Sequence, residues 1–120
     1  MIGCIIQART GSTRLPGKTM MPITENDTVL SFGIKQVKSN KTIDKIVIAT
    51  TDLPEDDLIV EYMEKLNISC FRGQSKDVLD RYYQCAKFFN FSIILRITSD
   101  CPLIDPLIID DVVSYFLKNN

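Results

Sequence analysis

Three of the fourteen cationic side chains in this 120-residue sequence fall within ten positions. They are Arg9, Arg14 and Lys18. Arginine binds phosphate oxygens through its planar fork, and lysine binds them as a point charge. Gly11 and Ser12 stand between the arginines, and a glycine lets the backbone approach an anion and turn its N–H groups toward it. An apolar run over residues 2–6 precedes them. This pattern predicts a loop that binds a polyphosphate at the end of a buried strand.

The loop differs from the Walker A loop of ATPases and GTPases, although Gly17-Lys18-Thr19 has the same ending. That motif has four residues between its first glycine and the Gly-Lys pair, whereas five separate Gly11 from Gly17 here. Pro16 has no N–H to offer a phosphate, and Pro22 disfavours a helical residue before it. We therefore exclude a Walker A loop.

The composition excludes several other classes of site. The sequence has no histidine, so nucleophilic triads and a histidine general base are ruled out, while nucleotidyl transfer depends mainly on positioning and charge neutralisation. The four cysteines are scattered and predict reduced, buried thiols rather than a zinc site. A net charge of -1 argues against a nucleic-acid partner. No apolar run approaches the roughly 20 residues of a membrane span, so we expect a cytoplasmic protein without a membrane partner.

Strand and helix patterns alternate along the chain. Strands are expected at residues 2–7, 45–50, 68–71 and 92–98. Helices are expected at residues 29–38 and from Pro54, Asp77 and Asp105 onward. Apolar strands that alternate with amphipathic helices predict one α/β domain over residues 1–120, with a Rossmann-like parallel sheet and helices on both faces. Ligands of such sheets bind beyond the carboxyl ends of the strands.

The helix patterns also predict which side chains are buried. The helix after Pro54 is expected to bury Leu58, Ile59, Tyr62, Met63 and Leu66. The helix after Asp77 is expected to bury Val78, Leu79, Tyr82, Ala86 and Phe89, and Tyr83 and Phe88 are also assigned to the core. Asp77 is expected to cap that helix and to pair with Arg81, four residues later.

Five blocks of sequence share a pattern that covers nearly the whole chain. They read IIQARTGSTRLPGK (5–18), VIATTD (47–52), FRG (71–73), DVLDRYY (77–83) and RITSDCPLIDP (96–106). In this order and spacing they resemble the cytidylyltransferases that activate acidic sugars as CMP derivatives, especially the spore coat polysaccharide type. The resemblance implies a nucleotide-diphospho-sugar transferase fold, of which this chain is the N-terminal, nucleotide-binding half. Full-length members continue for about another such length.

The resemblance also implies roles for the residues of the first loop. Arg9 and Lys18 correspond to the family's ligands of the CTP triphosphate. Gly11 and Ser12 would donate backbone N–H groups, and the Ser12 hydroxyl, to phosphate oxygens. Arg14 would contact phosphate or form an ion pair with a neighbouring loop, and both readings stay open.

Other blocks supply the rest of the expected site. Asp100 corresponds to the carboxylate that binds Mg²⁺ beside the α-phosphate, and with Arg9 and Lys18 it forms the expected catalytic set. Ala8 belongs to the nucleotide-binding motif. Asp52 would close the base or ribose pocket, although an ordinary turn aspartate is the alternative. Arg72 would lie near the pyrimidine, and the alternative is an ordinary position on the protein surface.

The reaction implied by the resemblance is transfer of CMP from CTP to an acidic sugar with release of pyrophosphate, for surface polysaccharide or glycan biosynthesis. Two other functions stay open. One is a non-catalytic nucleotide-binding module, and the other is a nucleotidyltransferase with a different nucleotide and acceptor. The sequence does not identify the sugar. Full-length relatives are expected to form homodimers.

Overall fold

The described part of the chain forms one parallel sheet of four strands. The computed structural model describes residues 1–10, 27–39, 42–98, 115 and 117–118. The strands are β1 (Ile2–Gln7), β2 (Lys45–Thr51), β3 (Ser69–Gly73) and β4 (Ile93–Thr98). They lie in the order β3-β2-β1-β4, and all three pairings are parallel. The predicted parallel α/β sheet is therefore confirmed.

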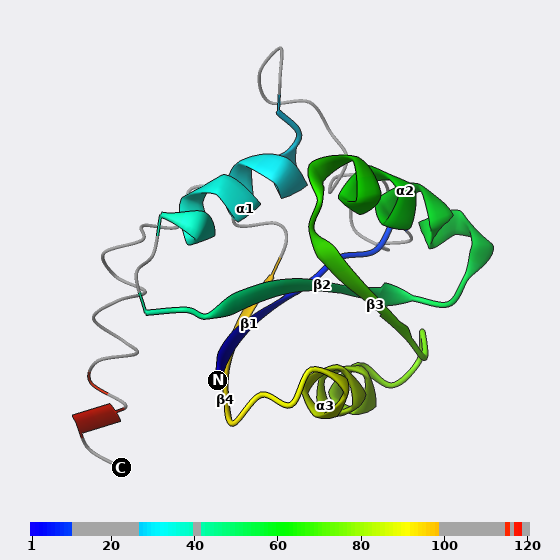
Figure 1. Ribbon diagram of the computed structural model, residues 1–120. Coiled ribbons are helices and arrows are strands. Elements are labelled where there is room, and N and C mark those ends of the chain that lie inside the picture. Colours follow the sequence, from blue (N-terminus) through cyan, green and yellow to red (C-terminus); the bar gives the residue numbers. More distant parts are fainter. Residues whose placement is uncertain (11–26, 40–41, 99–114, 116, 119–120) are drawn as a thin grey trace.

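Helices cover both faces of this sheet (Figure 1). The α-helices are α1 (Val29–Lys38), α2 (Asp57–Leu66) and α3 (Val78–Phe88). A 3-10 turn, η2 (Pro54–Asp56), leads into α2, so Pro54 opens this turn rather than the α-helix itself. α1 and α2 lie on one face and α3 lies on the other. The last expected helix lies outside the described residues, except that residues 115, 117 and 118 are helical.

Side-chain caps set where two of the helices begin. Thr28 Oγ1 accepts a hydrogen bond from the backbone N–H of Ser31 at 3.1 Å, and Ser31 Oγ accepts one from the N–H of Thr28 at 2.8 Å. This reciprocal capping box satisfies two N–H groups that would otherwise lack partners in α1. Asp77 caps α3 by accepting from the N–H of Asp80 at 3.0 Å, as predicted.

The two apolar cores are separated by the sheet. Cys4 and Ile6 of β1 pack with α1 and α2, and Ile5 packs toward α3. In α2 the buried side chains are Ile59 and Met63, whereas Leu58 is 60% exposed. The expected burial of Leu58 is therefore wrong, and Leu66 at 36% exposed also lies at the surface. Both residues lie at the edge of a stripe that is narrower than the sequence pattern suggests.

The same correction applies to α3. Tyr82, Cys85 and Ala86 face the sheet. Leu79, Tyr83 and Phe88 are exposed to 74%, 60% and 72%, so their predicted burial is wrong. Successive side chains on a helix point about 100° apart. A residue next to one that faces the sheet can therefore point to solvent. Spacing identified the helix correctly but not its rotation about its own axis.

The three described cysteines are free thiols, as expected, and Cys101 lies outside the described residues. Cys4 and Cys85 are buried, and Cys70 is half-buried. Burial raises the pKa of Cys4 and of Cys85 from 9.0 to about 12. Burial also raises the pKa of Cys70 to about 11, against a smaller opposing effect of the Arg72 charge.

These thiols are expected to resist modification by DTNB at about pH 8 in the folded protein. Because the thiolate is the reacting form, the raised pKa values lower its fraction by about 100-fold or more. The measurement is the labelling rate of a Cys101→Ser variant, with and without urea. All three thiols are expected to react at once after unfolding, and rapid labelling of the folded chain would contradict the prediction.

Candidate functional site

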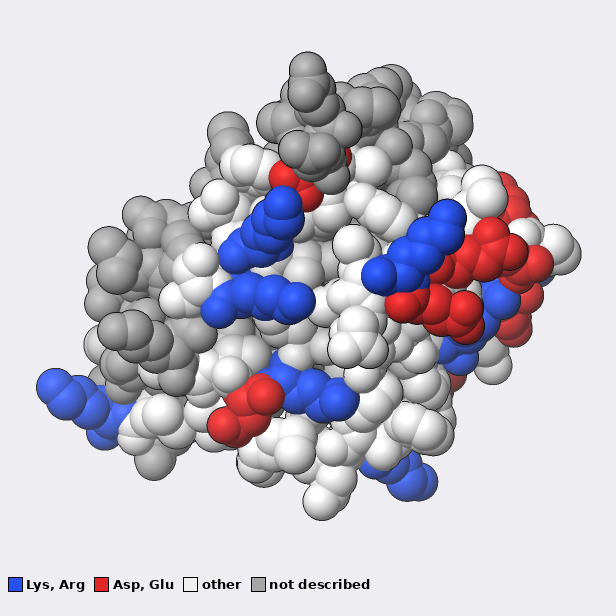
Figure 2. Space-filling model, turned by 45° about the horizontal axis from the view of Figure 1, so that its top comes forward, with Lys and Arg blue, Asp and Glu red and all other residues white. Residues whose placement is uncertain are grey.

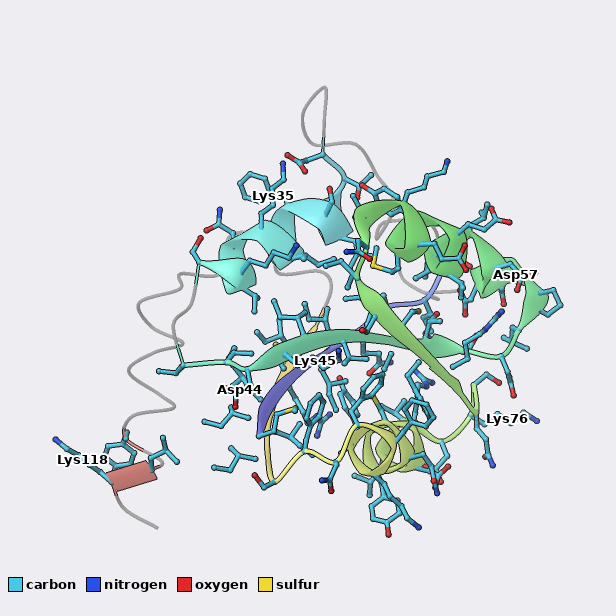
Figure 3. All side chains as sticks on the ribbon, viewed as in Figure 1. Lys35, Asp44, Lys45, Asp57, Lys76 and Lys118 are labelled. Atoms are coloured by element: carbon cyan, nitrogen blue, oxygen red, sulfur yellow. The ribbon has the colours of Figure 1, made fainter. Side chains whose placement is uncertain are left out.

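A cavity of about 440 Å³ lies beyond the carboxyl ends of β1, β2 and β3. Its described lining consists of Arg9, Leu53, Glu55, Asp56, Ser75, Lys76 and Val78. The segments after β1, β2 and β3 all contribute, and this end of a parallel α/β sheet is where ligands bind. Figure 3 shows Asp57 and Lys76 at this end of the sheet, and Asp44 and Lys45 at the opposite end. The cavity is the candidate site.

Arg9 is the predicted site residue that lines this cavity. It is half-buried and follows Ala8, which is 1% exposed. The backbone N–H of Ala8 donates to the carbonyl of Ala49 at 3.0 Å, which extends the pairing of β1 with β2 by one step. The structure therefore places Arg9 directly beyond the last anchored residue of the central strand. The other predicted residues of this loop, and the metal ligand, lie outside the described residues: Gly11, Ser12, Arg14, Lys18 and Asp100.

Asp56 is a buried carboxylate on the cavity wall, with 1% of its surface exposed. One oxygen, Oδ1, accepts from the N–H of Thr10 at 2.8 Å and from Thr10 Oγ1 at 2.9 Å. The other oxygen, Oδ2, accepts a short hydrogen bond from Thr51 Oγ1. Asp56 is not among the site residues predicted from the sequence. The contact spans 46 positions, so no local pattern could have revealed it.

Arg72 does not line the cavity but braces the loop after β2. Its guanidinium donates to the carbonyls of Thr51 at 2.8 Å and Leu53 at 2.7 Å, and to the Asp57 carboxylate at 2.7 Å. The expected contact of Arg72 with a pyrimidine stays a prediction. Asp52 is exposed, and its backbone N–H donates to the carbonyl of Gly73 at 3.0 Å. Its expected role at the base or ribose also stays a prediction.

Arg81 is a second buried ionic group behind the cavity wall. It is 1% exposed, and it donates to the carbonyls of Gln74 at 3.0 Å and Ser75 at 3.2 Å. Within the part of the chain that the structure describes, its Nη1 has no hydrogen-bond partner. The predicted pair with Asp77 is wrong, because Asp77 caps the helix and the Arg81 guanidinium turns toward the β3–α3 loop.

The environment of Arg81 is unfavourable for its charge. Burial is the main cause that lowers the pKa of the Arg81 guanidinium, and the nearby charge of Arg9 lowers it further. The carboxylates of Asp56 and Asp52 act in the opposite direction. The burial of Arg81 was not predicted from the sequence, although a signal was present. Positions 78, 81, 82 and 85 follow the helical period, which places Arg81 on the stripe that faces the sheet.

The described residues do not by themselves form a metal centre. No group of three or more potential ligands occurs among residues 1–10, 27–39, 42–98 and the last helical positions. The Asp56 carboxylate already accepts three hydrogen bonds, so it is a poor Mg²⁺ ligand in this arrangement. The expected binding of Mg²⁺ by Asp100 stays a prediction, since Asp100 lies outside the described residues.

The distribution of surface charge bears on nucleic-acid binding, and the length of the helices bears on membrane spanning. Figure 2 shows acidic and basic side chains interspersed on the displayed face of the described chain, rather than one broad basic area. Such an area is what nucleic-acid binding requires. None of the described helices has the length and apolar character needed to cross a bilayer.

Gly73 is expected to be required for the position of Arg81. A Cβ at residue 73 would lie 2.9 Å from Arg81 Cγ, closer than packed carbons approach. Gly73→Ala is therefore expected to lower the free energy of unfolding in urea by about 1–3 kcal/mol. The matched control is the same substitution in an Arg81→Ala background, which removes the Cγ atom. An equal loss in both backgrounds would contradict the proposed clash.

Comparison with known proteins agrees with this geometry. The spore coat polysaccharide biosynthesis protein SpsF of Bacillus subtilis is 38% identical over 113 residues, which cover 91% of this chain and 47% of SpsF. The 3-deoxy-manno-octulosonate cytidylyltransferase of Chlamydia trachomatis is 31% identical over 121 residues, covering 97% of this chain and 45% of the enzyme.

The solved structure of a cytidylyltransferase from Leptospira borgpetersenii superimposes with a TM-score of 0.94 and is 44% identical. The match covers 99% of this chain and 50% of that one. The chain thus spans about half the length of the relatives it matches. The family model described as Cytidylyltransferase matches residues 3–120. This match shows that the chain belongs to the cytidylyltransferase family.

Proposed function

We propose that this chain binds CTP in the cavity beyond β1, β2 and β3, and that it forms the nucleotide-binding half of an enzyme that transfers CMP to an acidic sugar. The observation that carries the proposal is the position of Arg9. This cation begins the family's phosphate-binding motif and lines the cavity directly after the central strand. Lys76 adds a second cation to the described wall.

In the proposed reaction the anomeric hydroxyl of the sugar attacks the α-phosphorus of CTP. A bond forms between the sugar oxygen and phosphorus, and the hydroxyl proton passes to solvent water. The bond to the β-phosphate bridging oxygen breaks, and pyrophosphate leaves with that electron pair. Arg9 and Lys18 would neutralise the triphosphate, and Gly11 and Ser12 would orient it through N–H groups and a hydroxyl. Such transfers rely on positioning and charge neutralisation, which suits a site without histidine.

We also propose that Asp100 binds Mg²⁺. Magnesium prefers carboxylate and phosphate oxygens and needs few protein ligands when a nucleotide supplies the rest. When bound, it would neutralise negative charge that develops at the α-phosphate. We assign this role to Asp100 from its match to the family motif. Asp56 is already engaged by Thr10 and Thr51, which makes it a poor alternative ligand.

The acidic sugar, the use in surface glycan synthesis, the homodimer and the cytoplasmic location are all proposals for the longer protein. The name of SpsF supports the use in polysaccharide synthesis, and the name of the octulosonate enzyme supports the acidic sugar. The present chain spans about half of each, so turnover is assigned to the complete enzyme rather than to these 120 residues alone.

Isothermal titration calorimetry of the chain with CTP, UTP and GTP in the presence of Mg²⁺ tests the nucleotide site. CTP is expected to bind most tightly, and Arg9→Ala is expected to weaken it by about tenfold, the equivalent of one lost charged hydrogen bond. The matched control is Lys87→Ala, which removes a cation from the other end of α3. Equal affinity for the three nucleotides, or an unchanged affinity in Arg9→Ala, would contradict the proposal. CTP binding without pyrophosphate release by the full-length protein would favour a non-catalytic module.

A further inference from the structure

The Asp56 carboxylate joins two loops that are far apart in the sequence. Thr10 follows β1, and Thr51 ends β2, and each donates to a different oxygen of Asp56. Thr10 Oγ1 also donates to the carbonyl of Glu55 at 3.2 Å. The start of the expected phosphate-binding loop is therefore fastened to the η2 turn by several bonds.

A purely structural role for Asp56 would be to cap α2, and its carboxylate does not do this. Asp56 occupies the N-cap position of α2, yet its side chain makes no capping hydrogen bond. Both oxygens point instead to Thr10 and Thr51. An aspartate at an N-cap normally satisfies the first helical N–H groups, so the carboxylate here serves the β1 loop at the expense of the helix.

This arrangement restrains the backbone on both sides of Arg9. Its neighbour Ala8 is fixed through the carbonyl of Ala49, and its other neighbour, Thr10, is fixed through Asp56. The backbone of Arg9 thus lies between two anchored residues while its side chain lines the cavity. Arg72 holds the carbonyls of Thr51 and Leu53, so the platform that carries Asp56 is itself braced.

From these contacts we infer that Asp56 is a positioning residue of the nucleotide site, which holds the backbone at Thr10 so that Arg9 faces the phosphates of the nucleotide. The inference rests on the proposed CTP site. Asp56 acts through Thr10 and Arg9 and does not itself touch the ligand. When a buried partner already holds a binding cation in place, less conformational entropy is lost as the ligand binds.

The test compares Asp56→Ala with Asp57→Asn, the matched control at the adjacent aspartate, which is exposed and pairs with Arg72. Two measurements are made on each folded variant. NMR of the free protein follows the exchange of the Thr10 amide and the signal of the Arg9 Nε–H group. Calorimetry then measures the affinity for CTP with Mg²⁺ and for inorganic pyrophosphate. Urea unfolding establishes that each variant is folded under the conditions used.

In Asp56→Ala, the Thr10 amide is expected to exchange faster, and the Arg9 signal is expected to shift. Affinities for CTP and for pyrophosphate are expected to fall on the order of tenfold. Asp57→Asn is expected to change none of these. Thr10→Ser keeps both the N–H and the hydroxyl that Asp56 accepts, so it is expected to bind CTP like the wild type, whereas Thr10→Val is expected to bind more weakly.

Three results would overturn the inference. They are an unchanged Thr10 amide in Asp56→Ala, an unchanged affinity for CTP and pyrophosphate despite a released amide, and an equal loss in Asp57→Asn. Should Asp56→Ala fail to fold, Thr10→Val against Thr10→Ser decides the question, and equal binding by these two overturns it. A wild-type chain that binds no CTP would refute the proposed function instead, and the NMR comparison and pyrophosphate titration would still decide the role of Asp56.

Discussion

The pairing of β1 on both of its edges is the constraint on which the rest of the fold depends. Gln7 lies opposite Ala49 of β2 and Thr98 of β4, and helices cover both faces of the strand. A strand enclosed in this way has to be apolar, and Cys4, Ile5 and Ile6 are indeed at most 2% exposed. Charged side chains that bind a ligand can therefore follow only after the strand ends. The cationic loop therefore starts at the carboxyl edge, next to the ends of the neighbouring strands.

At that edge the protein stabilises its loops mainly with ionic side chains rather than with apolar packing. Asp56 joins the ends of β1 and β2, Arg72 braces the turn after β2, and Arg81 holds the carbonyls of the β3–α3 loop. A buried charged group that keeps its hydrogen bonds imposes a specific geometry, because few other positions satisfy it. These contacts join the described ends of β1 and β2 to the η2 turn, and they fix the described β3–α3 loop to α3.

Much of the architecture follows from local patterns, whereas the polar framework of the site does not. Apolar period and capping residues predicted the four strands, the three described helices and the cap at Asp77. They placed Leu79 and Tyr83 in the core wrongly, since a helical period fixes the existence of a face but not its rotation against the sheet. The hydrogen bonds of Asp56 were missed for a different reason. A carboxylate that reaches 46 positions back has no signature in the residues around it.

Two arginines supply local positive charge at the proposed nucleotide site, although the whole chain carries a formal charge of -1. Arg9 lines the cavity, and after burial its charge is the next cause that lowers the pKa of the Arg81 guanidinium. Charges kept away from water are poorly screened, so both cations contribute to the local field. A polyanion that binds beside Arg9 offsets the mutual repulsion of the two arginines, whereas an uncharged nucleoside does not. In the proposed complex, a polyanion beside Arg9 would therefore lower the cost of keeping Arg81 both charged and buried.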